Sequence, residues 1–298
     1  MEEYTGRIIR GIGGFYYVDT GDDGIFTCRA KGLFRNEGVK PLVGDVVKLI
    51  PVVDTDVDNP GSITAVLERT SELVRPAIAN IDRAIVIFAA ADPEPNLMLL
   101  DRFLCEMERR RVESIVCFNK SDLADRERLS QLSDIYEKAG YRVVLTSAKN
   151  GDIDALKKEL EGRVCAVAGP SGAGKSSIVN LLQSDMEMET GLISKKLGRG
   201  RHTTRRAELL KVEGMKDTYI ADTPGFSSLE VAVEDPSMVY TLFPEIRAQE
   251  KNCRFSLCSH IKEKDCAVRS AVKDGIISKE RYDSYCSLYR ECVSRKKY

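Results

Sequence analysis

The sequence lacks the features that would place it in a membrane or outside the cell. None of its apolar runs approaches the roughly eighteen residues that a membrane-spanning helix needs. Its first ten residues, MEEYTGRIIR, carry acidic side chains where a secretory signal carries a basic segment followed by an apolar one. Internal repeats, low-complexity tracts and long disordered linkers are also absent. We therefore expect a cytoplasmic globular protein, and 298 residues are enough for two or three domains.

The chain also lacks a strong net charge. Its formal charge of −1 gives no overall argument for binding to nucleic acid. The charges are uneven, however, because residues 195–216 contain eight basic and two acidic residues. Residues 251–298 contain twelve basic and six acidic residues, whereas residues 1–67 contain seven basic and ten acidic ones. Each basic segment is compatible with a solvated face or with a surface that contacts RNA phosphates, and charge alone leaves both open.

A fully paired disulfide framework within one chain is excluded, because nine cysteines is an odd number. Cys117 and Cys165 lie in apolar runs that are typical of core strands, where cysteine behaves as a small hydrophobic residue. Cys286 and Cys292 are also expected to be structural.

One group of cysteines has the chemistry of a metal site. Cys253, Cys258, His260 and Cys266 form the pattern C-x4-C-x-H-x5-C, and His260 is one of only two histidines in the chain. Three thiolates and one imidazole are a suitable tetrahedral ligand set for Zn²⁺. The spacing differs from the common paired CxxC, so reduced buried cysteines are the alternative. Because few apolar residues lie nearby, a bound metal is expected to be needed for this region to fold.

Residues 1–67 contain about five short alternating runs separated by turn residues. This pattern predicts a small β-barrel, and the OB-fold is the commonest barrel with five strands. Four aromatic residues in these runs fit either the barrel core or a surface on which nucleic-acid bases stack: Phe15, Tyr16, Tyr17 and Phe26.

From about residue 81, apolar strands alternate with amphipathic helices. The run RAIVIFAA reads as a strand, after which Asn96 can cap a helix. One face of that helix is apolar at the spacing i, i+3, i+4, i+7, formed by Leu100, Phe103, Leu104 and Met107. Such alternation predicts a mostly parallel, doubly wound sheet covered on both faces. After about residue 231 the strand pattern stops, and helices are expected near 267–274 and 278–293. One face of the second helix carries Tyr282, Tyr285, Tyr289 and Val293.

A phosphate-binding loop follows the predicted strand RVCAVAG. The sequence there matches G-x-x-x-x-G-K-[ST] at every fixed position, and a helix beginning SSIVNLL comes next, as the motif requires. The backbone N–H groups of such a loop surround phosphates, and the helix adds the positive end of its dipole. Lys175 would neutralise the β- and γ-phosphates and Ser176 would ligate Mg²⁺; the alternative is a glycine-rich turn that binds nothing. The loop comprises Gly169, Pro170, Ser171, Gly172, Ala173, Gly174, Lys175, Ser176 and Ser177.

A second phosphate-related motif, DTPG, ends another predicted strand about fifty residues later. Asp222 would hold Mg²⁺, and the N–H of Gly225 would meet the γ-phosphate. A lone DxxG is a weak signal, but its position at a strand end favours this role. Between the loop and this motif, the segment GRGRHTTR offers Thr203 and Thr204 as the residue that completes the Mg²⁺ shell. Thr204 is the preferred candidate, although one sequence does not decide between the two.

The motif Asn119-Lys120-Ser-Asp122 predicts recognition of guanine. A carboxylate at Asp122 can accept hydrogen bonds from the N1–H and the exocyclic amine of guanine, whereas adenine would leave it unpaired. At the end of the next predicted strand, Thr146, Ser147, Ala148 and Lys149 have the form of the loop that supports the base. Both motifs lie at carboxyl ends of strands, where open α/β sheets bind ligands.

In this chain the base-reading motifs precede the phosphate loop, which reverses the usual Ras-like order. Joining the ends of the usual domain and cutting it elsewhere produces this order with the same site in space. A doubly wound domain whose termini lie close together tolerates such a cut. As a consequence, the DTPG segment leads straight into the C-terminal region, so its movement on loss of the γ-phosphate would act directly on that region.

With these motifs the chain resembles the ribosome small subunit-dependent GTPase A family (RsgA, also called YjeQ or YloQ), whose members are circularly permuted GTPases. The resemblance spans essentially all residues. It implies an OB-fold RNA-binding domain at residues 1–68, a circularly permuted P-loop GTPase domain at 69–230 and a mainly helical zinc-binding domain at 231–298. It also implies a factor in late maturation of the small (30S) ribosomal subunit that contacts 16S rRNA. The expected ligands are GTP or GDP with Mg²⁺, and one structural Zn²⁺. DNA, a membrane and a second copy are not required, so a monomer is expected.

One position departs from the Ras-like pattern. Just after the DxxG motif, where Ras-like proteins carry a water-orienting glutamine, this chain has Phe226. We therefore expect slow intrinsic hydrolysis that a partner or another residue accelerates. His202 is the candidate for positioning water, and the alternative is a histidine that is exposed or faces RNA. Two rival functions are a GTP-dependent RNA-binding switch, which the missing glutamine suits, and an ATPase or kinase, which the guanine motif argues against.

Overall fold

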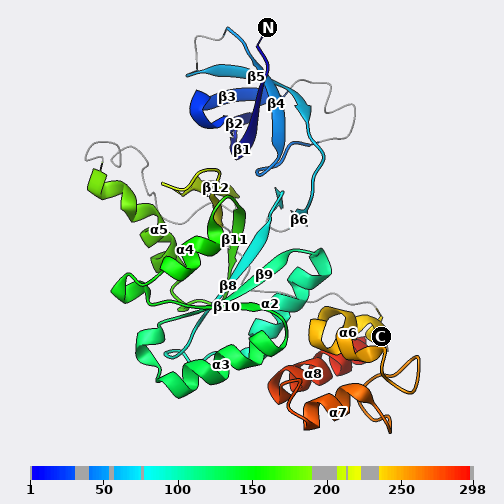
Figure 1. Ribbon diagram of the computed structural model, residues 1–298. Coiled ribbons are helices and arrows are strands. Elements are labelled where there is room, and N and C mark those ends of the chain that lie inside the picture. The colour runs from blue at the N-terminus through cyan, green and yellow to red at the C-terminus, as the bar shows by residue number, and fades with distance from the viewer. Residues whose placement is uncertain are drawn as a thin grey trace. The chain divides into compact units, whose positions relative to one another are not determined.

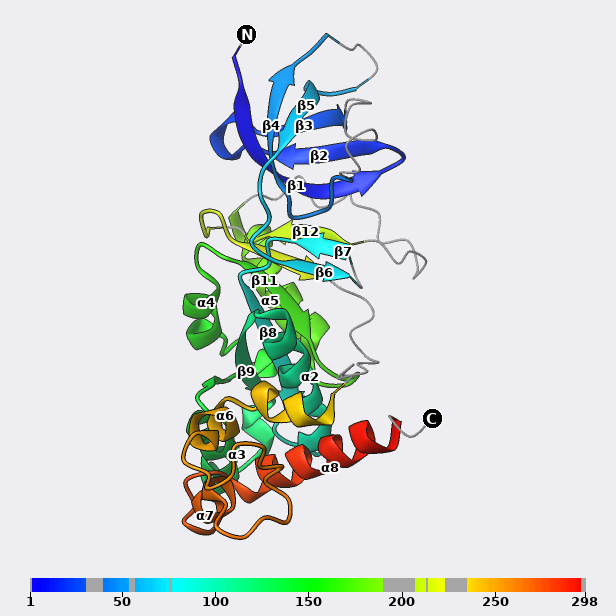
Figure 2. The ribbon, with the colours of Figure 1, turned by 90° about the vertical axis from the view of Figure 1, so that its right-hand side faces the viewer.

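The computed structural model describes residues 2–30, 40–53, 57–74, 77–189, 207–212, 214–222 and 235–295. The chain forms two compact units, and neither is continuous in the sequence. The first comprises residues 1–84, 157–167 and 179–226, and the second comprises residues 85–156, 168–178 and 227–298. Figures 1 and 2 show their helices and strands from two directions at right angles. Among the helices that the structure describes, none is both long enough and apolar enough to cross a bilayer.

The first unit contains a closed five-stranded barrel (Figure 2). Its strands are β1 (Tyr4–Ile12), β2 (Phe15–Asp19), β3 (Ile25–Ala30), β4 (Val46–Pro51) and β5 (Pro60–Val66), with a short helix η1 (Gly21–Asp23) between β2 and β3. Pairing runs β1–β2–β3–β5–β4 and returns to β1, so the predicted barrel is confirmed. The apolar side chains that point inward are at most 5% exposed: Ile8, Val18, Phe26, Cys28, Val47, Leu49 and Ile63.

The four aromatic residues of the barrel divide between its two surfaces. Phe26 is buried in the core and Tyr16 packs against it. Successive side chains of a strand point to opposite faces, so Phe15 and Tyr17 of β2 lie on the outer face. There the guanidinium of Arg29 lies 4.6 Å from the ring centroid of Phe15, and that of Arg10 lies 4.1 Å from the ring centroid of Tyr17.

A strand hairpin extends the barrel sheet within the same unit. β12 (Glu208–Lys211) pairs antiparallel with β13 (Tyr219–Asp222), and β13 is parallel to β11 (Val164–Ala168). β12 also pairs with β1, where Glu208 lies opposite Arg10. A smaller hairpin is formed by β6 (Glu72–Val74) and β7 (Ala77–Ala79). The sequence pattern did not predict β12, because a strand of four residues is too short to show a clear alternation.

In the second unit, the strands β8 (Arg83–Ala89), β9 (Glu113–Asn119) and β10 (Arg142–Leu145) lie in the order β10–β9–β8, with β9 and β10 parallel. The helices are α2 (Leu97–Arg110) and α3 (Arg126–Lys138), and η2 (Ser121–Leu123) and η3 (Ala148–Asn150) are short turns. Helix α4 (Asp154–Leu160) begins in this unit and ends in the first. The predicted start of α2 is confirmed, because the Asn96 side chain accepts a hydrogen bond from the Leu99 N–H at 3.0 Å. Its four predicted apolar residues are all buried.

The C-terminal residues of this unit are helical, as predicted. They form η4 (Pro236–Leu242), α6 (Pro244–Glu250), α7 (Ala267–Lys273) and α8 (Lys279–Arg295), which Figure 1 shows in yellow to red. Tyr282, Tyr289 and Val293, which share one face of α8 with Tyr285, are only half-buried. The fully buried positions are instead Arg281, Ser284, Tyr285, Cys286, Leu288 and Cys292. The reason is electrostatic: Arg281 turns inward to two acidic side chains, Asp101 of α2 and Glu245 of α6.

Candidate nucleotide and metal sites

The predicted phosphate loop connects β11 to α5 (Lys175–Glu189), and two of its glycines lie where no other residue fits. Gly169 has a φ of 139°, and a Cβ there would lie 2.0 Å from the backbone oxygen of Ile87. Gly174 has a φ of 87°, and its Cβ would lie 2.2 Å from Nδ2 of Asn119. The loop therefore packs directly against β8 and against the base-reading motif.

Lys175 lies at the start of α5, where the motif requires a cation. Its Nζ donates a 2.7 Å hydrogen bond to the backbone oxygen of Pro170, so the ammonium group lies over the loop. Burial lowers the pKa of Lys175 from its usual value. An anionic phosphate placed here would replace the carbonyl with a stronger partner and favour the charged ammonium form. Ser176, the predicted Mg²⁺ ligand, is exposed at the same end of the helix.

Asn119 joins the three segments that the sequence assigned to guanine nucleotide binding. The side chain is 1% exposed at the end of β9. Its Nδ2 donates to the backbone oxygen of Ala173 in the phosphate loop at 3.0 Å. Its Oδ1 accepts hydrogen bonds from Thr146 Oγ1 at 3.2 Å and from the Ala148 N–H at 3.0 Å. One amide group therefore holds the base loop and the phosphate loop at a fixed separation, which is a role that the sequence motif alone did not indicate.

Asp122 is exposed and is oriented by the neighbouring base loop. Ser147 is buried, and its Oγ donates a 2.6 Å hydrogen bond to Oδ1 of Asp122. Because an ionised carboxylate has several acceptor positions, this bond orients the group and leaves acceptor capacity for a ligand. Lys120 has a left-handed backbone with a φ of 60°, and its Nζ donates to the backbone oxygen of Asp92. Lys149 is exposed in η3 beside this loop.

Several predicted residues fall outside the part of the chain that the structure describes: His202, Thr203, Thr204, Gly225 and Phe226. Asp222 is the last residue of β13, so the DTPG motif begins at the carboxyl end of a strand as the sequence indicated. The roles proposed for these residues remain predictions.

The four predicted metal ligands lie together. One potential ligand atom from each of Cys253, Cys258, His260 and Cys266 falls within 4.8 Å of the others. The Sγ atoms of Cys253 and Cys266 are 3.9 Å apart, and each is 3.5 Å from Nδ1 of His260. A tetrahedral Zn²⁺ with Zn–S bonds of about 2.3 Å separates two sulfurs by about 3.8 Å. The cluster therefore fits a structural zinc site.

The electrostatics of this cluster also suit a bound cation. Burial lowers the pKa of His260, which favours the neutral imidazole that binds a metal. Burial raises the pKa of the Cys258 thiol to about 12. A cation would have to displace protons from the thiols, and it would then compensate the buried thiolate charge.

A carboxylate that the sequence analysis missed organises the loop around these ligands. Glu263 accepts hydrogen bonds from the N–H groups of Ser259, Ile261 and Lys262 and from Oγ of Ser259, at 2.6 to 3.1 Å. Although burial alone would raise its pKa, these bonds, with that from the Ser259 side chain foremost, lower the pKa of Glu263 to about 2. Two tyrosines of α8 hold the same loop, since Tyr282 donates to the His260 oxygen at 2.7 Å and Tyr285 to the Ser259 oxygen at 2.6 Å. The position of Glu263 between two ligands in the sequence was the signal available.

Replacing Glu263 with glutamine is expected to weaken zinc binding about tenfold, since groups that support metal ligands typically contribute 10- to 100-fold. The amide keeps one acceptor, but its NH₂ would face backbone N–H groups. Competition of the purified protein with a chromophoric chelator measures the affinity. Glu280→Gln is the matched control, because Glu280 is exposed in the first turn of α8. Equal zinc affinities in the two variants would contradict the role assigned to Glu263.

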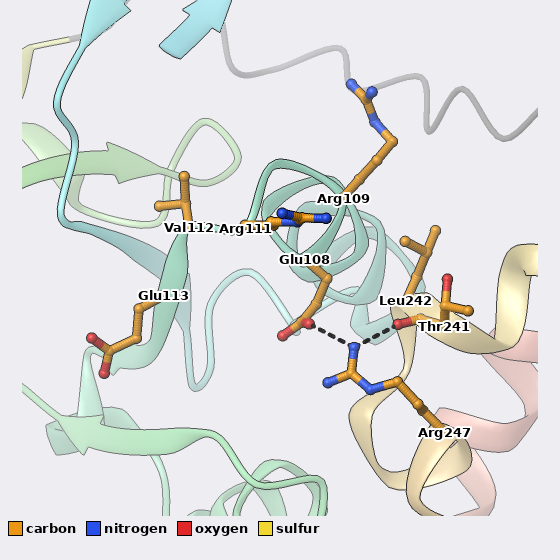
Figure 3. Close-up of a pocket in the computed structure, with 8 residues that line it drawn as sticks. All are labelled: Glu108, Arg109, Arg111, Val112, Glu113, Thr241, Leu242 and Arg247. Atoms are coloured by element: carbon orange, nitrogen blue, oxygen red, sulfur yellow. Dashed lines mark hydrogen bonds and ion pairs between the residues drawn. The ribbon is translucent and has the colours of Figure 1, made fainter. Parts of the chain in front are cut away.

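A separate pocket lies away from these motifs. It has a volume of about 550 Å³ and is lined by the end of α2, the start of β9 and residues of η4 and α6. Figure 3 shows the Arg247 side chain within it, joined to Glu108 and Thr241. Nη1 of Arg247 lies 3.6 Å from a carboxylate oxygen of Glu108 and donates a 3.0 Å hydrogen bond to the backbone oxygen of Thr241. Because β9 begins here and carries the base-reading motif at its other end, this pocket is distinct from the candidate nucleotide site.

The class of protein follows from the order of these parts along the chain. The two base-binding segments come first among them: the base-reading motif at the end of β9 and the base loop at the end of β10. The two phosphate-related segments come later: the phosphate loop before α5, and the DTPG motif, which begins with the last residue of β13. Asn119 connects the first three in space. This arrangement defines a circularly permuted P-loop GTPase with an N-terminal barrel and a C-terminal region that fits a zinc site.

Comparisons with known proteins agree. The family described as RsgA GTPase matches residues 66–232, and the RsgA N-terminal domain matches residues 5–57. A protein of Agathobacter rectalis called small ribosomal subunit biogenesis GTPase RsgA is 50% identical, with 99% of this chain and 100% of the relative covered. A protein of the same name from Caldanaerobacter subterraneus is 45% identical, with 100% and 98% covered.

Two solved structures are similar over nearly the whole chain. One is YjeQ from Thermotoga maritima, with a TM-score of 0.82, 32% identity and coverage of 98% of this chain and 99% of that one. The other is YloQ, described as a circularly permuted GTPase, with a TM-score of 0.80, 35% identity and coverage of 99% and 96%. The chain belongs to the RsgA GTPase family. It is therefore a GTP-hydrolysing enzyme, and the resemblance that the motifs suggested is confirmed.

Proposed function

We propose that this GTPase acts in late maturation of the small (30S) ribosomal subunit, in the cytoplasm and as a monomer. Its slow intrinsic hydrolysis of GTP is accelerated by the subunit, with which it makes contacts through 16S rRNA. The observation that carries the GTP-binding part of the proposal is the bonding of Asn119 to both the base loop and the phosphate loop. The names of the relatives, which refer to small ribosomal subunit biogenesis, supply the partner.

Different residues bind the base and the phosphates of GTP. Asp122 reads the guanine edge, and Thr146, Ser147, Ala148 and Lys149 hold the base loop. The backbone N–H groups of residues 169–177 surround the phosphates, and Lys175 neutralises their charge. Asn119 keeps these segments together, and Lys120 belongs to the same base-reading motif and donates from its Nζ to the backbone oxygen of Asp92.

Two separate sets of residues are proposed to hold the two metal ions. Ser176, Thr204 and Asp222 would hold Mg²⁺, which supplies positive charge to the phosphate oxygens when bound. His202 is proposed to position water, and Gly225 to contact the γ-phosphate through its N–H. Cys253, Cys258, His260 and Cys266 would hold Zn²⁺, whose contribution is structural.

The barrel supports contact with RNA. Its outer face presents Phe15 and Tyr17 with a guanidinium over each ring, so aromatic surface for bases and positive charge for phosphates lie side by side. The basic segments at residues 195–216 and 251–298 would add further phosphate contacts, which the net acidic residues 1–67 cannot supply alone.

GTP hydrolysis with and without purified small subunits tests the proposal directly. We expect acceleration of about tenfold or more, since partners of GTPases commonly supply the missing stabilisation of the transition state. ATP and the large subunit are the controls, and neither is expected to support the effect. Normal GTP binding without acceleration would contradict the proposal and favour a GTP-dependent RNA-binding switch in which hydrolysis is incidental, a role that Phe226 in place of the glutamine would suit.

A further inference from the structure

A buried carboxylate of the barrel lies against the hairpin β12–β13. Asp19, at the end of β2, is 4% exposed. Its Oδ2 accepts a 2.9 Å hydrogen bond from the Tyr219 hydroxyl and lies 2.9 Å from Nζ of Lys211. Its Oδ1 accepts a 2.9 Å hydrogen bond from the N–H of Gly21. Both oxygens are therefore occupied, and two of the three donors come from the hairpin.

The two hairpin donors form a cross-strand pair. Lys211 and Tyr219 lie directly opposite each other in the antiparallel pairing of β12 and β13, so Asp19 contacts both strands at one position along the hairpin. The guanidinium of Arg7 in β1 lies 5.8 Å from the centroid of the Tyr219 ring, which adds a second barrel contact at the same position.

The barrel also holds the opposite end of the hairpin. Glu208 of β12 lies opposite Asp222 of β13 on one side and opposite Arg10 of β1 on the other. Nη1 of Arg10 is 3.7 Å from the Glu208 carboxylate. Asp222, the proposed Mg²⁺ residue, is thus two strands away from a barrel arginine in one continuous sheet.

The contacts between Asp19 and the hairpin are a hydrogen bond and an ion pair, whose strengths depend on how the groups are aligned. Placing a carboxylate where it is 4% exposed costs free energy unless it is hydrogen-bonded, and apolar packing would hold a hairpin without that cost. Hydrogen bonds also specify one alignment, whereas apolar packing tolerates sliding. In the sequence, the hairpin stands between the basic segment with His202 and Thr204 and the DTPG motif, the two segments proposed to sense the γ-phosphate. A change in its alignment would therefore alter both.

We propose that Asp19 is a positioning residue, which through Tyr219 and Lys211 couples the barrel to the hairpin that leads to both γ-phosphate-sensing segments. This inference rests on the proposed function, because it assigns the barrel a part in the response to the small subunit. Subunit contact with the barrel then changes the rate of hydrolysis. Because coupling between two sites is reciprocal in binding, the bound nucleotide also changes the affinity for the subunit.

The test measures the stimulation factor, defined as kcat with small subunits divided by kcat without them. Tyr219→Phe removes only the hydroxyl, Asp19→Asn removes the charge, and Lys211→Met removes the ammonium group. Each is expected to lower the stimulation factor about fivefold or more, the lower end of typical coupling. The KM for GTP is expected to stay the same, because none of these side chains is proposed to contact the nucleotide. The double variant of Asp19→Asn and Tyr219→Phe is expected to lose less than the product of the two single losses, because the two side chains share one hydrogen bond.

Lys48→Met is the matched control for Lys211→Met. Lys48 lies in barrel strand β4, opposite Thr5 of β1, and its ammonium group pairs with Glu3 at 2.9 Å, so its variant should keep the wild-type stimulation factor. A second readout is the ratio of subunit affinities with a GTP analogue and with GDP, which Tyr219→Phe should bring closer to one.

The outcomes separate this inference from the proposed function. Wild-type protein without stimulation by small subunits would overturn the proposed function and this inference with it. Stimulated wild-type protein with an unchanged stimulation factor in Tyr219→Phe and Lys211→Met would overturn the inference alone. An equal loss in Lys48→Met would also overturn it, because the effect would then be general to the barrel. If Asp19→Asn does not fold, the Tyr219→Phe result decides.

Discussion

Replacing Asp122 with asparagine is expected to change the preferred nucleotide from GTP to xanthosine triphosphate. The carboxylate is proposed to accept two hydrogen bonds from guanine, and each hydrogen bond to a charged group is worth about 1.5–3 kcal/mol. Losing both corresponds to a fall in GTP affinity of about 10²- to 10⁴-fold. Xanthine keeps the N1–H donor but carries an oxygen in place of the exocyclic amine, so an amide at this position can pair with both groups.

Ser147 determines which way the new amide would point. Its hydroxyl donates to Oδ1 of Asp122 at 2.6 Å, so the amide oxygen of the variant should take that position. The amide NH₂ then replaces Oδ2 and donates to the xanthine oxygen. Without this bond the asparagine would have two orientations, and the change in preference would be weaker.

Competition binding with GTP, xanthosine triphosphate and ATP measures the effect. Asp125→Asn is the matched control, because it replaces an aspartate with asparagine in the same way, three residues further along the chain. Its carboxylate caps α3 by accepting the Arg128 N–H at 2.8 Å, and asparagine is an equally good cap. GTP affinity within threefold of wild type in Asp122→Asn would contradict guanine reading by this residue. Lost affinity for every nucleotide would indicate a damaged loop instead.

The parts of the molecule that the sequence predicted are those governed by local chemistry. Helix α2 was predictable because all of its signals are local. Its cap, Asn96, directly precedes the helix, and its apolar residues repeat within the fourteen residues of the helix itself. The phosphate loop was predictable because its glycines serve backbone geometry that no other residue allows, as Gly169 and Gly174 show. The cluster of Cys253, Cys258, His260 and Cys266 was predictable because three cysteines and a histidine close together in sequence have few roles other than holding a metal.

The parts that were missed depend on partners far away in the chain. Asp19 and Tyr219 are 200 positions apart, and Arg281 and Asp101 are 180 positions apart. A period or a motif describes one segment at a time, so it does not show that a charged residue on α8 will be buried. The double role of Asn119 was missed for the same reason, since its bond to Ala173 spans 54 positions.

Replacing Arg281 with methionine is expected to destabilise the second unit by about 3–5 kcal/mol, because it would leave two buried carboxylates without the cation that neutralises them. The arginine side chain is fully buried, and its Nε and Nη2 donate to the two oxygens of Glu245 at 2.8 and 3.1 Å. Its Nη1 donates to Asp101 Oδ1 at 2.8 Å. The guanidinium also lies 4.7 Å from the ring centroid of Phe243, so the loss includes a cation–π contact. Methionine keeps most of the volume, which separates the loss of charge from the creation of a cavity.

Native-state hydrogen exchange of the α8 and α2 amides measures this effect, because it reports the opening free energy of this unit by itself. Arg290→Met is the matched control, since Arg290 is exposed on the same helix and surface changes are usually within about 0.5 kcal/mol. Replacing all three charges together, as Asp101→Leu, Glu245→Leu and Arg281→Met, is expected to recover most of the lost stability, because no buried charge is then left unpaired. If the triple variant is no more stable than Arg281→Met, the loss comes from packing around Phe243 and not from the unpaired carboxylates. If the triple variant recovers the lost stability, the buried charges serve to align the helices. The arginine then fixes one arrangement of α8 against α6 and α2, whereas apolar side chains would stabilise the three helices without specifying that arrangement.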